Sequence, residues 1–381
     1  MRYGHGLLGG LVVSGRSAAL IHSVVVPTRN HAASLRSTLA SLAKAVHPTE
    51  AWEVVVVDNS DDPERVSTRA TVSSLGDDHF RYVPMKPLGL MAARHLGVEE
   101  ARGDIISWID DDEDVVSTWF CGVLECMECH DAALVTGPFR PVYGGPPPAW
   151  LDGLWDSSPL GSHLALLTLS DFGSQDREIP PLYVWGGNLS VPRSIFYQAK
   201  GSHPDYMPPP LRDFQGPGEC ALTTKVGALG LSAWYTPRCE VAHHVPAARM
   251  TLEYMRRRAF TVGIEMSFAE YRREHGLEPS PNTDNSHLPS HGSGLRLVAR
   301  RIGLGKMRRG LRGALDSRRT RRASAHPESP EDVRLLIRQE MLRGYAHHRT
   351  ALAASHELRE WVLRPDFLGE NGIPPGADRI P

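Results

Sequence analysis

The sequence has few cysteines and no long apolar run. Its five cysteines in 381 residues are an odd number, which argues against a secreted disulfide framework and favours a reducing cytoplasm. No apolar stretch approaches the roughly 20 residues that span a bilayer. We therefore expect a cytoplasmic protein without a spanning helix, and we interpret residues 1–20, which include LLGGLVV, as a poorly defined leader.

The sequence also lacks a net charge of one sign. Its 42 Lys and Arg residues nearly balance 44 Asp and Glu residues, and no nucleic-acid recognition motif is present, so we expect no nucleic-acid partner. With 41% hydrophobic and 23% charged residues, the composition is typical of a globular protein. Cys126, Cys129 and His130 have metal-like spacing, but no second Cys or His pair lies at a suitable distance, which argues against a zinc site.

Acidic residues gather in the stretch IISWIDDDEDVV, residues 105–116. Its first five residues are β-branched or aromatic apart from one serine, which predicts a buried strand. Carboxylates held together repel one another unless they face water or a cation. The pattern favours a Mg²⁺ or Mn²⁺ site, with a solvated acidic turn as the alternative. The acids are Asp110, Asp111, Asp112, Glu113 and Asp114.

The N-terminal half alternates between strands and helices. Residues 23–26 and 52–57 have the composition of buried strands, and leucines at helical spacing predict a helix over about residues 35–46. Such a unit predicts a parallel sheet. The loop at residues 27–31 contains no glycine. It therefore lacks both the fingerprint of a dinucleotide-binding Rossmann site and the glycine-rich phosphate loop expected of a nucleotidyltransferase, the enzymatic alternative.

Three segments of this half carry a resemblance. In order, SVVVPTRN, VVVVDNS and PLGLMAARHLGVEEARGDIISWIDDDEDV resemble the nucleotide-sugar-binding half of family 2 glycosyltransferases over residues 23–116, and later pieces extend the resemblance to about Gly263. The resemblance implies the GT-A fold, which is α/β with a mostly parallel sheet and helices on both faces. It also implies an inverting enzyme that uses Mn²⁺ or Mg²⁺ and a nucleotide diphosphate sugar, with a UDP-sugar favoured.

The resemblance assigns roles to individual positions. Asp110 and Asp112 match the ends of the family's DXD metal motif. One histidine of the pair His243 and His244 is expected near the diphosphate and the metal, and we choose His244, with a structural histidine as the alternative. The positions expected to contact the nucleotide sugar are Pro27, Thr28, Asn30, Asp58, Lys86, Gly89, Arg94, Asp110, Asp111, Gly187 and Asn188.

The catalytic base is the position at which the chain departs from the family. Members usually have Glu-Asp at the start of a helix here, whereas this chain has Glu219 followed by Cys220. Because an inverting transfer needs a carboxylate near the attacking group, we expect Glu219 to be the base, with Asp213 as the second candidate. The non-enzymatic alternative is a degenerate protein that binds a sugar nucleotide without turnover.

The sequence does not identify the acceptor, which could be a glycan, a lipid-linked substrate, a peptide or a natural product. The stretch from Gly137 to Pro148 is rich in proline and glycine, which indicates either a lid or acceptor-binding loop or a plain surface connection. Trp150, Trp155 and Phe172 are candidate platforms for a sugar ring, with packing in the core as the alternative.

The chain divides at about residue 276. We expect a glycosyltransferase catalytic domain over residues 21–276, a flexible linker over residues 277–294, and a basic, mainly helical extension over residues 295–381. Within the extension, Arg296–Arg322 contains many arginines and a single acid, with apolar residues between them. This pattern favours peripheral contact with an anionic membrane surface or, equally, a solvated helical appendage.

Overall fold

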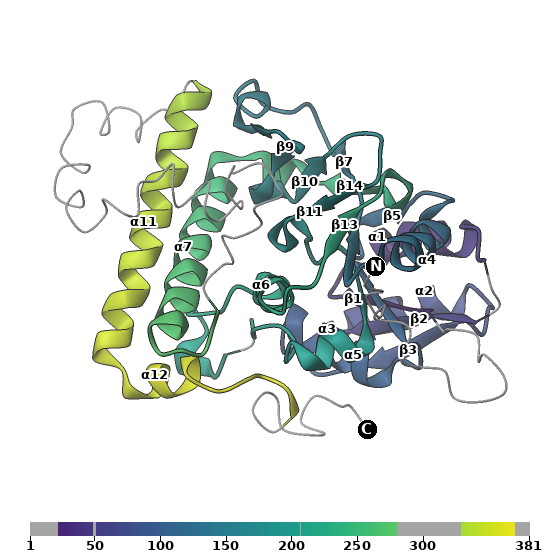
Figure 1. Cartoon of the computed structure of the whole chain (residues 1–381), viewed down its shortest axis with the longest axis horizontal. Coiled ribbons are helices and arrows are strands. Elements are labelled where there is room, and N and C mark those ends of the chain that lie inside the picture. The colour runs from purple at the N-terminus through teal and green to yellow at the C-terminus, as the bar shows by residue number, and fades with distance from the viewer. Residues whose placement is uncertain (1–21, 49–50, 206, 280–328, 370–381) are drawn as a thin grey trace, which may run out of the picture.

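The computed structural model describes residues 22–48, 51–205, 207–279 and 329–369. These ranges form two sheets, helices packed on the larger sheet, and a pair of long helices at one side (Figure 1). None of the helices within them has both the length and the apolar character of a membrane span. The expected leader, most of the expected linker and the basic segment Arg296–Arg322 lie outside the described residues.

The main sheet is built largely from parallel strands. Its order is β11-β13-β6-β12-β4-β1-β2-β3, and β1 pairs parallel with both β2 and β4. The valines of β1 and β2 are fully buried, as expected where helices cover both faces of a parallel sheet. β12 runs antiparallel between β4 and β6. The strands are β1 (His22–Thr28), β2 (Trp52–Asp58), β3 (Phe80–Pro84), β4 (Ile105–Ile109), β6 (Leu134–Thr136), β11 (Arg177–Ile179), β12 (Asn188–Pro192) and β13 (Ala233–Tyr235).

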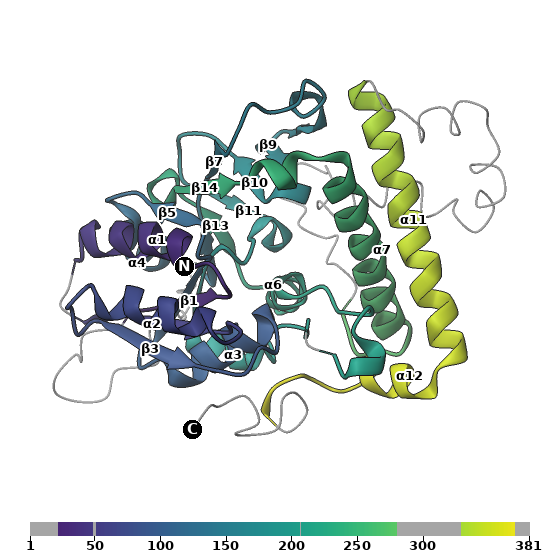
Figure 2. The ribbon, with the colours of Figure 1, turned by 180° about the vertical axis from the view of Figure 1, so that it is seen from behind.

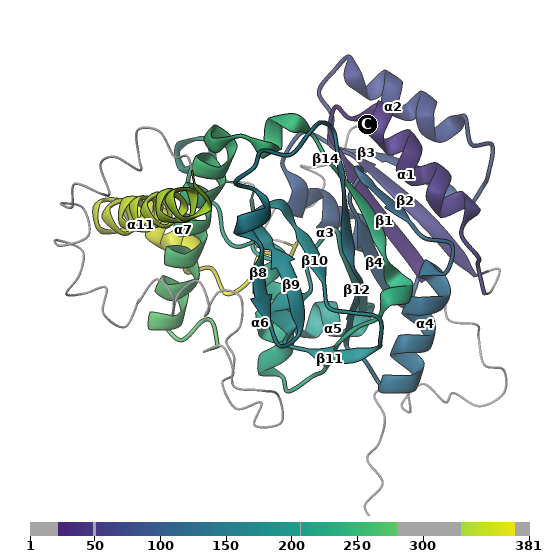
Figure 3. The same cartoon turned by 90° about the horizontal axis from the view of Figure 1, so that it is seen from above.

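Helices cover both faces of the main sheet (Figure 3). Apolar residues of α3, α5 and α6 form one buried layer with the sheet, and those of α1 and α4 form a second layer. This arrangement confirms the predicted α/β class with helices on both faces. The helices are α1 (Ala32–Lys44), α2 (Glu64–Ser73), α3 (Leu90–Glu100), α4 (Trp119–His130), α5 (Arg193–Gln198) and α6 (Glu219–Ala228).

The second sheet has the order β5-β14-β7-β10-β9-β8. β7 runs through the proline- and glycine-rich stretch for which we expected only a loop, so that expectation is wrong there. The reason is long-range pairing, because β7 lies parallel to β14 about 100 residues later in the chain. The strands are β5 (Glu113–Val115), β7 (Phe139–Tyr143), β8 (Asp156–Ser158), β9 (Gly161–Leu164), β10 (Leu169–Asp171) and β14 (Val241–Val245).

Short 3₁₀ turns join several of these elements. They matter here because η6 lies directly between β14 and the long helix that follows it. The turns are η1 (Asp152–Leu154), η2 (Ala165–Leu167), η3 (Pro181–Tyr183), η4 (Pro209–Leu211), η5 (Pro237–Cys239) and η6 (Ala247–Met250).

Two long helices, α7 (Leu252–Glu274) and α11 (Pro330–Ala354), lie side by side, as both views show (Figures 1 and 2). Two glycines permit their close approach. A Cβ at Gly263 would overlap the Met341 carbonyl, and one at Gly344 would overlap the Phe260 carbonyl. The described part of the expected extension is helical. α11 ends before Ser355, which caps the next helix, α12 (His356–Val362).

Candidate active site

An acidic cluster, which we define as Asp110, Asp111, Asp112 and Glu113, follows the carboxyl end of β4. β4 is a fully buried strand between β1 and β12. β5 begins at Glu113 and belongs to the second sheet, so the chain passes from one sheet to the other through the cluster. Asp114, the fifth acid, lies outside the cluster, where its Oδ2 accepts a hydrogen bond from Ser37 at 2.8 Å.

Arg94 joins the acidic cluster to α6. Its side chain is 1% exposed; Nη2 donates to Asp110 Oδ1 at 2.6 Å, and Nη1 donates to Glu219 Oε2 at 3.4 Å. The guanidinium carbon lies 5.2 Å from the centre of the Trp108 ring, a cation–π contact. Burial would lower the pKa of Arg94, but the charges of Asp110 and Glu219 outweigh it and raise that pKa. Arg94 therefore stays charged and holds the two carboxylates in one site.

The acidic cluster carries a surplus of negative charge. Burial, followed by the charge of Asp110, raises the pKa of Glu113 well above its usual range, and burial also raises the pKa of Asp110. Burial opposes ionisation of Asp112 as well, yet the pKa of Asp112 is lowered because neighbouring groups, the guanidinium of Arg249 among them, stabilise its carboxylate. A site with this balance favours binding of a further cation.

Two glycines directly before Asn188 make room for this arrangement. A Cβ at Gly186 would overlap the guanidinium of Arg94. A Cβ at Gly187 would overlap the carboxylate of Glu113. The structure therefore brings Gly187 to the acidic cluster, and it does so through packing of the protein's own side chains.

Two residues expected at the donor are instead in the interior. Asn188 is 1% exposed; its amide nitrogen donates to the Cys239 carbonyl at 2.7 Å, and its oxygen accepts from Trp119 Nε1 at 3.0 Å. Asp58 is fully buried and accepts a hydrogen bond from the Tyr82 hydroxyl at 2.7 Å. Both side chains are therefore engaged within the core, where they support the loops around the site, and their contact with a donor stays a prediction.

The loop after β1 reaches the acidic cluster. Thr28 Oγ1 donates to Asp111 Oδ2 at 2.5 Å, and Pro27 is buried beside it at the end of the strand. Asn30 has a left-handed backbone with φ 60°, and its amide donates to Asp61 Oδ2 at 3.0 Å. The structure thus brings Thr28 to the cluster and leaves Asn30 exposed in the loop that follows.

The loop between β3 and α3 contains two further expected positions. Lys86 is exposed there. Gly89 has φ 128°, and a Cβ at this position would approach within 2.7 Å of Asp205 Oδ1. Asp205 caps α3, since its oxygens accept from the backbone N–H groups of Leu90 at 2.6 Å and Met91 at 2.9 Å. Sequence reasoning missed Asp205 because it lies more than 100 residues from the helix that it caps.

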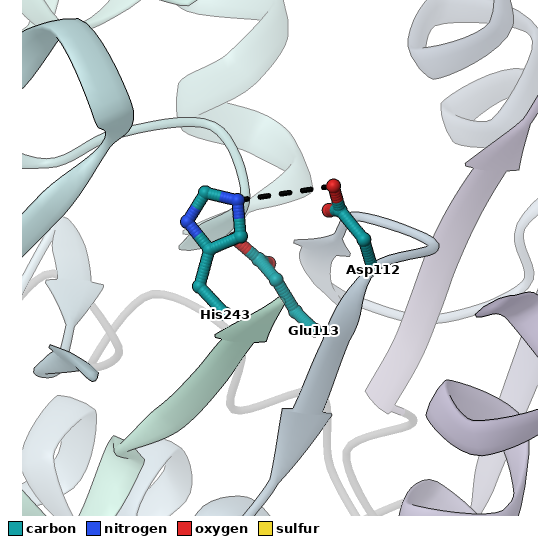
Figure 4. Close-up of side chains that lie close together, drawn as sticks. All are labelled: Asp112, Glu113 and His243. Carbon is teal, nitrogen blue, oxygen red and sulfur yellow. Dashed lines mark ion pairs between the residues drawn. The ribbon is translucent and has the colours of Figure 1, made fainter. Parts of the chain in front are cut away.

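Three side chains could together hold a metal ion: Asp112, Glu113 and His243 (Figure 4). One ligand atom from each lies within 4.8 Å of the others. His243 faces Glu113 across the pairing of β14 with β5. His244, the next residue, points to the opposite side, where its Nε2 lies 2.9 Å from Asp114 Oδ2. The geometry therefore favours His243 over His244, the residue that we expected, as the candidate ligand.

The donor set of this group fits a hard divalent ion. Carboxylate oxygens suit Mg²⁺, and an imidazole nitrogen beside them is also acceptable to Mn²⁺. Asp110, which we expected as a ligand, is not in this group. Its Oδ1 accepts a hydrogen bond from Arg94. Within the described ranges, the cysteines and histidine of the rejected zinc pattern do not form such a group.

Glu219 begins α6 and is the base candidate that the structure brings to the cluster. Its side chain is 25% exposed, so it contacts both Arg94 and solvent. Asp213 is exposed, and among the described residues no ion pair joins it to the cluster. Burial, followed by the charge of Glu219, raises the pKa of the Cys220 thiol, which argues against a role for Cys220 as a nucleophile.

The aromatic candidates for sugar stacking belong to packed layers. Phe172 is 1% exposed and its ring centre lies 5.4 Å from that of Tyr183 and 5.3 Å from that of Tyr235. Trp150 and Trp155 are partly buried against the apolar cluster between the second sheet and α7. The packing alternative therefore holds for Phe172.

Arg249 is a second residue that sequence reasoning missed. It lies in η6, and its Nη1 is 3.1 Å from Asp112 Oδ2. The available signal was an arginine shortly after the strand that carries the histidine pair. That signal is weak, because the preceding proline and the turn decide where the side chain lies.

Comparison with known proteins places part of the chain in a family. The profile of Glycosyl transferase family 2 matches residues 23–180. Succinoglycan biosynthesis protein ExoM of Rhizobium meliloti (strain 1021) is 35% identical over 121 residues, which are 31% of this chain and 38% of that protein. Validoxylamine A glucosyltransferase of Streptomyces hygroscopicus subsp. jinggangensis (strain 5008) is 29% identical over 218 residues, 48% of this chain and 47% of that protein.

The chain spans less than half the length of these two relatives. Among solved structures, that of S. aureus TarS 1-349 covers 87% of this chain and 92% of its own, with a TM-score of 0.44 and 14% identity. The assignment depends on the family profile, whose range contains β1 to β4 and the whole acidic cluster. Residues 23–180, less than half of the chain, are therefore similar to glycosyl transferase family 2.

Proposed function

We propose that this protein transfers a sugar from a nucleotide diphosphate sugar to an acceptor hydroxyl or amine, with inversion at the anomeric carbon. The observation that carries the proposal is the pair of hydrogen bonds from Arg94, which links Asp110 of the acidic cluster to Glu219 at the start of α6. The family match and the glycosyltransferase names of relatives support it. A UDP-sugar is the favoured donor because of the family resemblance.

A divalent ion, Mn²⁺ or Mg²⁺, is part of the proposal. Asp112, Glu113 and His243 would hold it. When bound, such an ion neutralises the charge that develops on the departing nucleoside diphosphate. Thr28 would help to orient the acids, since its hydroxyl already donates to Asp111.

Glu219 is the proposed general base. It accepts the acceptor's proton while the acceptor oxygen or nitrogen forms its bond to the anomeric carbon and the bond to the diphosphate oxygen breaks. Two features orient this carboxylate: its position at the N-terminal end of α6 and the hydrogen bond from Arg94. Attack on the face opposite the leaving group inverts the configuration, and no covalent intermediate on the protein is required.

The acceptor and the site of action are proposals of wider scope. The acceptor would be a glycan, a lipid-linked substrate, a peptide or a natural product. The basic segment Arg296–Arg322, outside the described residues, would contact an anionic membrane surface at its cytoplasmic side. Co-sedimentation of the full chain with anionic and with neutral vesicles tests this contact, and equal sedimentation with both would contradict it.

The proposed donor site is tested by thermal unfolding of the full chain with a panel of nucleoside diphosphates, each with Mn²⁺ and with chelator. We expect selective stabilisation by one nucleoside diphosphate that depends on Mn²⁺. The same stabilisation should be weakened in Asp112→Asn and retained in Asp61→Asn, a matched change of an exposed carboxylate in the neighbouring loop. No shift with any nucleotide, with donor sugars also tried, would sink the proposal.

A further inference from the structure

Arg249 occupies the space between two of the candidate metal ligands. Its Nη1 lies 3.1 Å from Asp112 Oδ2 and 3.3 Å from His243 Nε2. These are two of the three ligand groups that the metal proposal uses. Figure 4 shows that the carboxylate of Asp112 and the ring of His243 turn toward one another. The guanidinium therefore donates to lone pairs that a metal ion would need.

The tautomer of His243 decides whether this contact is a genuine hydrogen bond. Nδ1 lies 3.3 Å from the Thr168 carbonyl, which only accepts, so Nδ1 carries the proton. Arg249 only donates, so Nε2 must present its lone pair. An ion pair between His243 and Asp112 would instead need a proton on Nε2, but that separation is 3.8 Å, longer than the contact with Arg249. The shorter contact places the guanidinium on the Nε2 side of the ring.

A histidine ring held in this way presents Nε2 to a cation. A ring whose Nδ1–H is bonded to a carbonyl directs Nε2 at a metal ion in many proteins. Here Nε2 already faces a cation, the guanidinium of Arg249. The Arg249 side chain is 33% exposed, whereas that of Asp112 is 12% exposed, so the arginine approaches from the solvent side.

Arg249 is also placed where it can withdraw. It belongs to η6, a four-residue turn between β14 and α7, in which its backbone N–H donates to the Pro246 carbonyl. A long side chain with one-third of its surface exposed has other rotamers available in solvent. The ligands Asp112 and His243 lie on the turn after β4 and on β14, which packing holds in place.

We propose that Arg249 is the protein's own counter-cation for Asp112 and His243, and that it must leave them before a divalent ion can bind. It thereby lowers the affinity of the site for a divalent ion in the absence of nucleotide. The guanidinium released in this way would be available to the phosphates of the donor, so metal and nucleotide would favour one another. The inference rests on the proposed function because it assumes that this site takes a divalent metal.

The test is calorimetric titration of the full chain with Mn²⁺ alone, at constant pH and without nucleotide. The variants are Arg249→Gln and, as a matched control, Arg256→Gln, whose arginine lies near Glu340 on α11. Removing a competing charged hydrogen-bond donor should tighten Mn²⁺ binding by about tenfold in Arg249→Gln and leave the control equal to wild type. With UDP present the advantage should shrink or reverse, because the arginine is then missing from the phosphates.

The outcomes separate the inference from the proposed function. Equal or weaker Mn²⁺ binding in Arg249→Gln overturns the inference and leaves the proposed metal site intact. Failure of both proteins to bind Mn²⁺ overturns the inference together with that metal site. The sugar-nucleotide proposal has its own separate failure, which is the lack of any stabilisation by nucleoside diphosphates.

Discussion

The acidic cluster after β4 differs in charge balance from an ionic network at the end of α7, which consists of Arg272, Glu278 and His203. Both bury an arginine against carboxylate. In the network, Arg272 Nε donates to Glu278 at 3.1 Å, and Glu278 also lies 2.7 Å from His203 Nε2. Arg272 Nη1 donates to the carbonyls of Val362 and Arg364, both at 2.6 Å. The network thus pairs a single carboxylate, that of Glu278, with Arg272 and His203, whereas the acidic cluster contains four carboxylates.

The difference teaches how buried charge is used in each place. Burial opposes ionisation of Glu278, but His203 and Arg272 outweigh it and lower the pKa of Glu278 to about 2. The pKa of Glu113 in the acidic cluster is instead raised well above its usual range. A matched network stabilises the fold and ties the C-terminal helices to the domain. A surplus of acid is destabilising by itself, which is expected where a ligand completes the site.

The network also affects the domain boundary that we expected at residue 276. Glu278 is 8% exposed and lies within this network, so the chain just beyond that boundary packs with the catalytic part. Leu368 lies close to Gly201, near α6. The described part of the extension is therefore in direct contact with the region that carries Glu219.

The largest effect should come from Glu219→Gln. Losing the proton acceptor should lower the rate of nucleoside diphosphate release from the active donor by about 10³-fold, with little change in folding, since the amide oxygen still accepts from Arg94. Asp213→Asn is the matched control and should retain the wild-type rate. If both variants turn over like wild type, Glu219 is not the base.

The second effect concerns the matched network. Glu278→Gln should lower the free energy of unfolding by about 3 kcal/mol, because it removes one partner from a buried ion pair. Because the folded pKa lies below the unfolded one, this loss is present at pH 7 and fades as the pH falls from about 4.5 toward 2. Urea unfolding at several pH values measures it. A loss that does not depend on pH would contradict the charge-based explanation.

The contact between the long helices predicts a smaller effect. Gly344→Ala should lower the free energy of unfolding by about 2 kcal/mol, since a Cβ there overlaps the Phe260 carbonyl and forces the helices apart. Gly145→Ala is the control, because its Cβ would lie an ordinary 3.6 Å from Ala247. Thermal unfolding compares the two. Equal stability of both variants would mean that the helices adjust without cost.

The smallest effect concerns Glu113 and is opposite in sign to that of Glu278→Gln. Glu113→Gln should raise the free energy of unfolding by about 1 kcal/mol at pH 7, because it removes a surplus buried charge while keeping the shape. Since the folded pKa is raised, the gain is largest above that pKa and disappears as the pH falls toward about 4.5. The same variant should lose metal-dependent stabilisation by nucleotide. Destabilisation at pH 7 would show that the carboxylate is matched after all.

Several features were predictable because they depend on local patterns. The valines of β1 and β2 and the leucines of α1 have periodicities that specify buried strands and an amphipathic helix. The acids after β4 were evident as a run in the sequence. Glu219 was identified as the base candidate through the family resemblance, and the structure brings it to Arg94.

Other features depended on pairing between distant segments. The alternation of a strand indicated that one histidine of the pair faces the site, but the register of β14 against β5 decided that it is His243. Asn188 and Asp58 were expected at the donor, yet packing against Trp119 and Tyr82 buries them. Nothing in the neighbouring sequence states these partners.

The sequence by itself determined the resemblance to family 2 glycosyltransferases, the α/β class and the acidic run, because each depends on residue types at short spacings. The tertiary structure alone decided which acids share a site, that Arg94 joins them to Glu219, and that Arg249 lies against Asp112. The physical reason is that charge interactions depend on distance in space and on burial. Both are decided by where the two sheets and α6 meet in the folded chain.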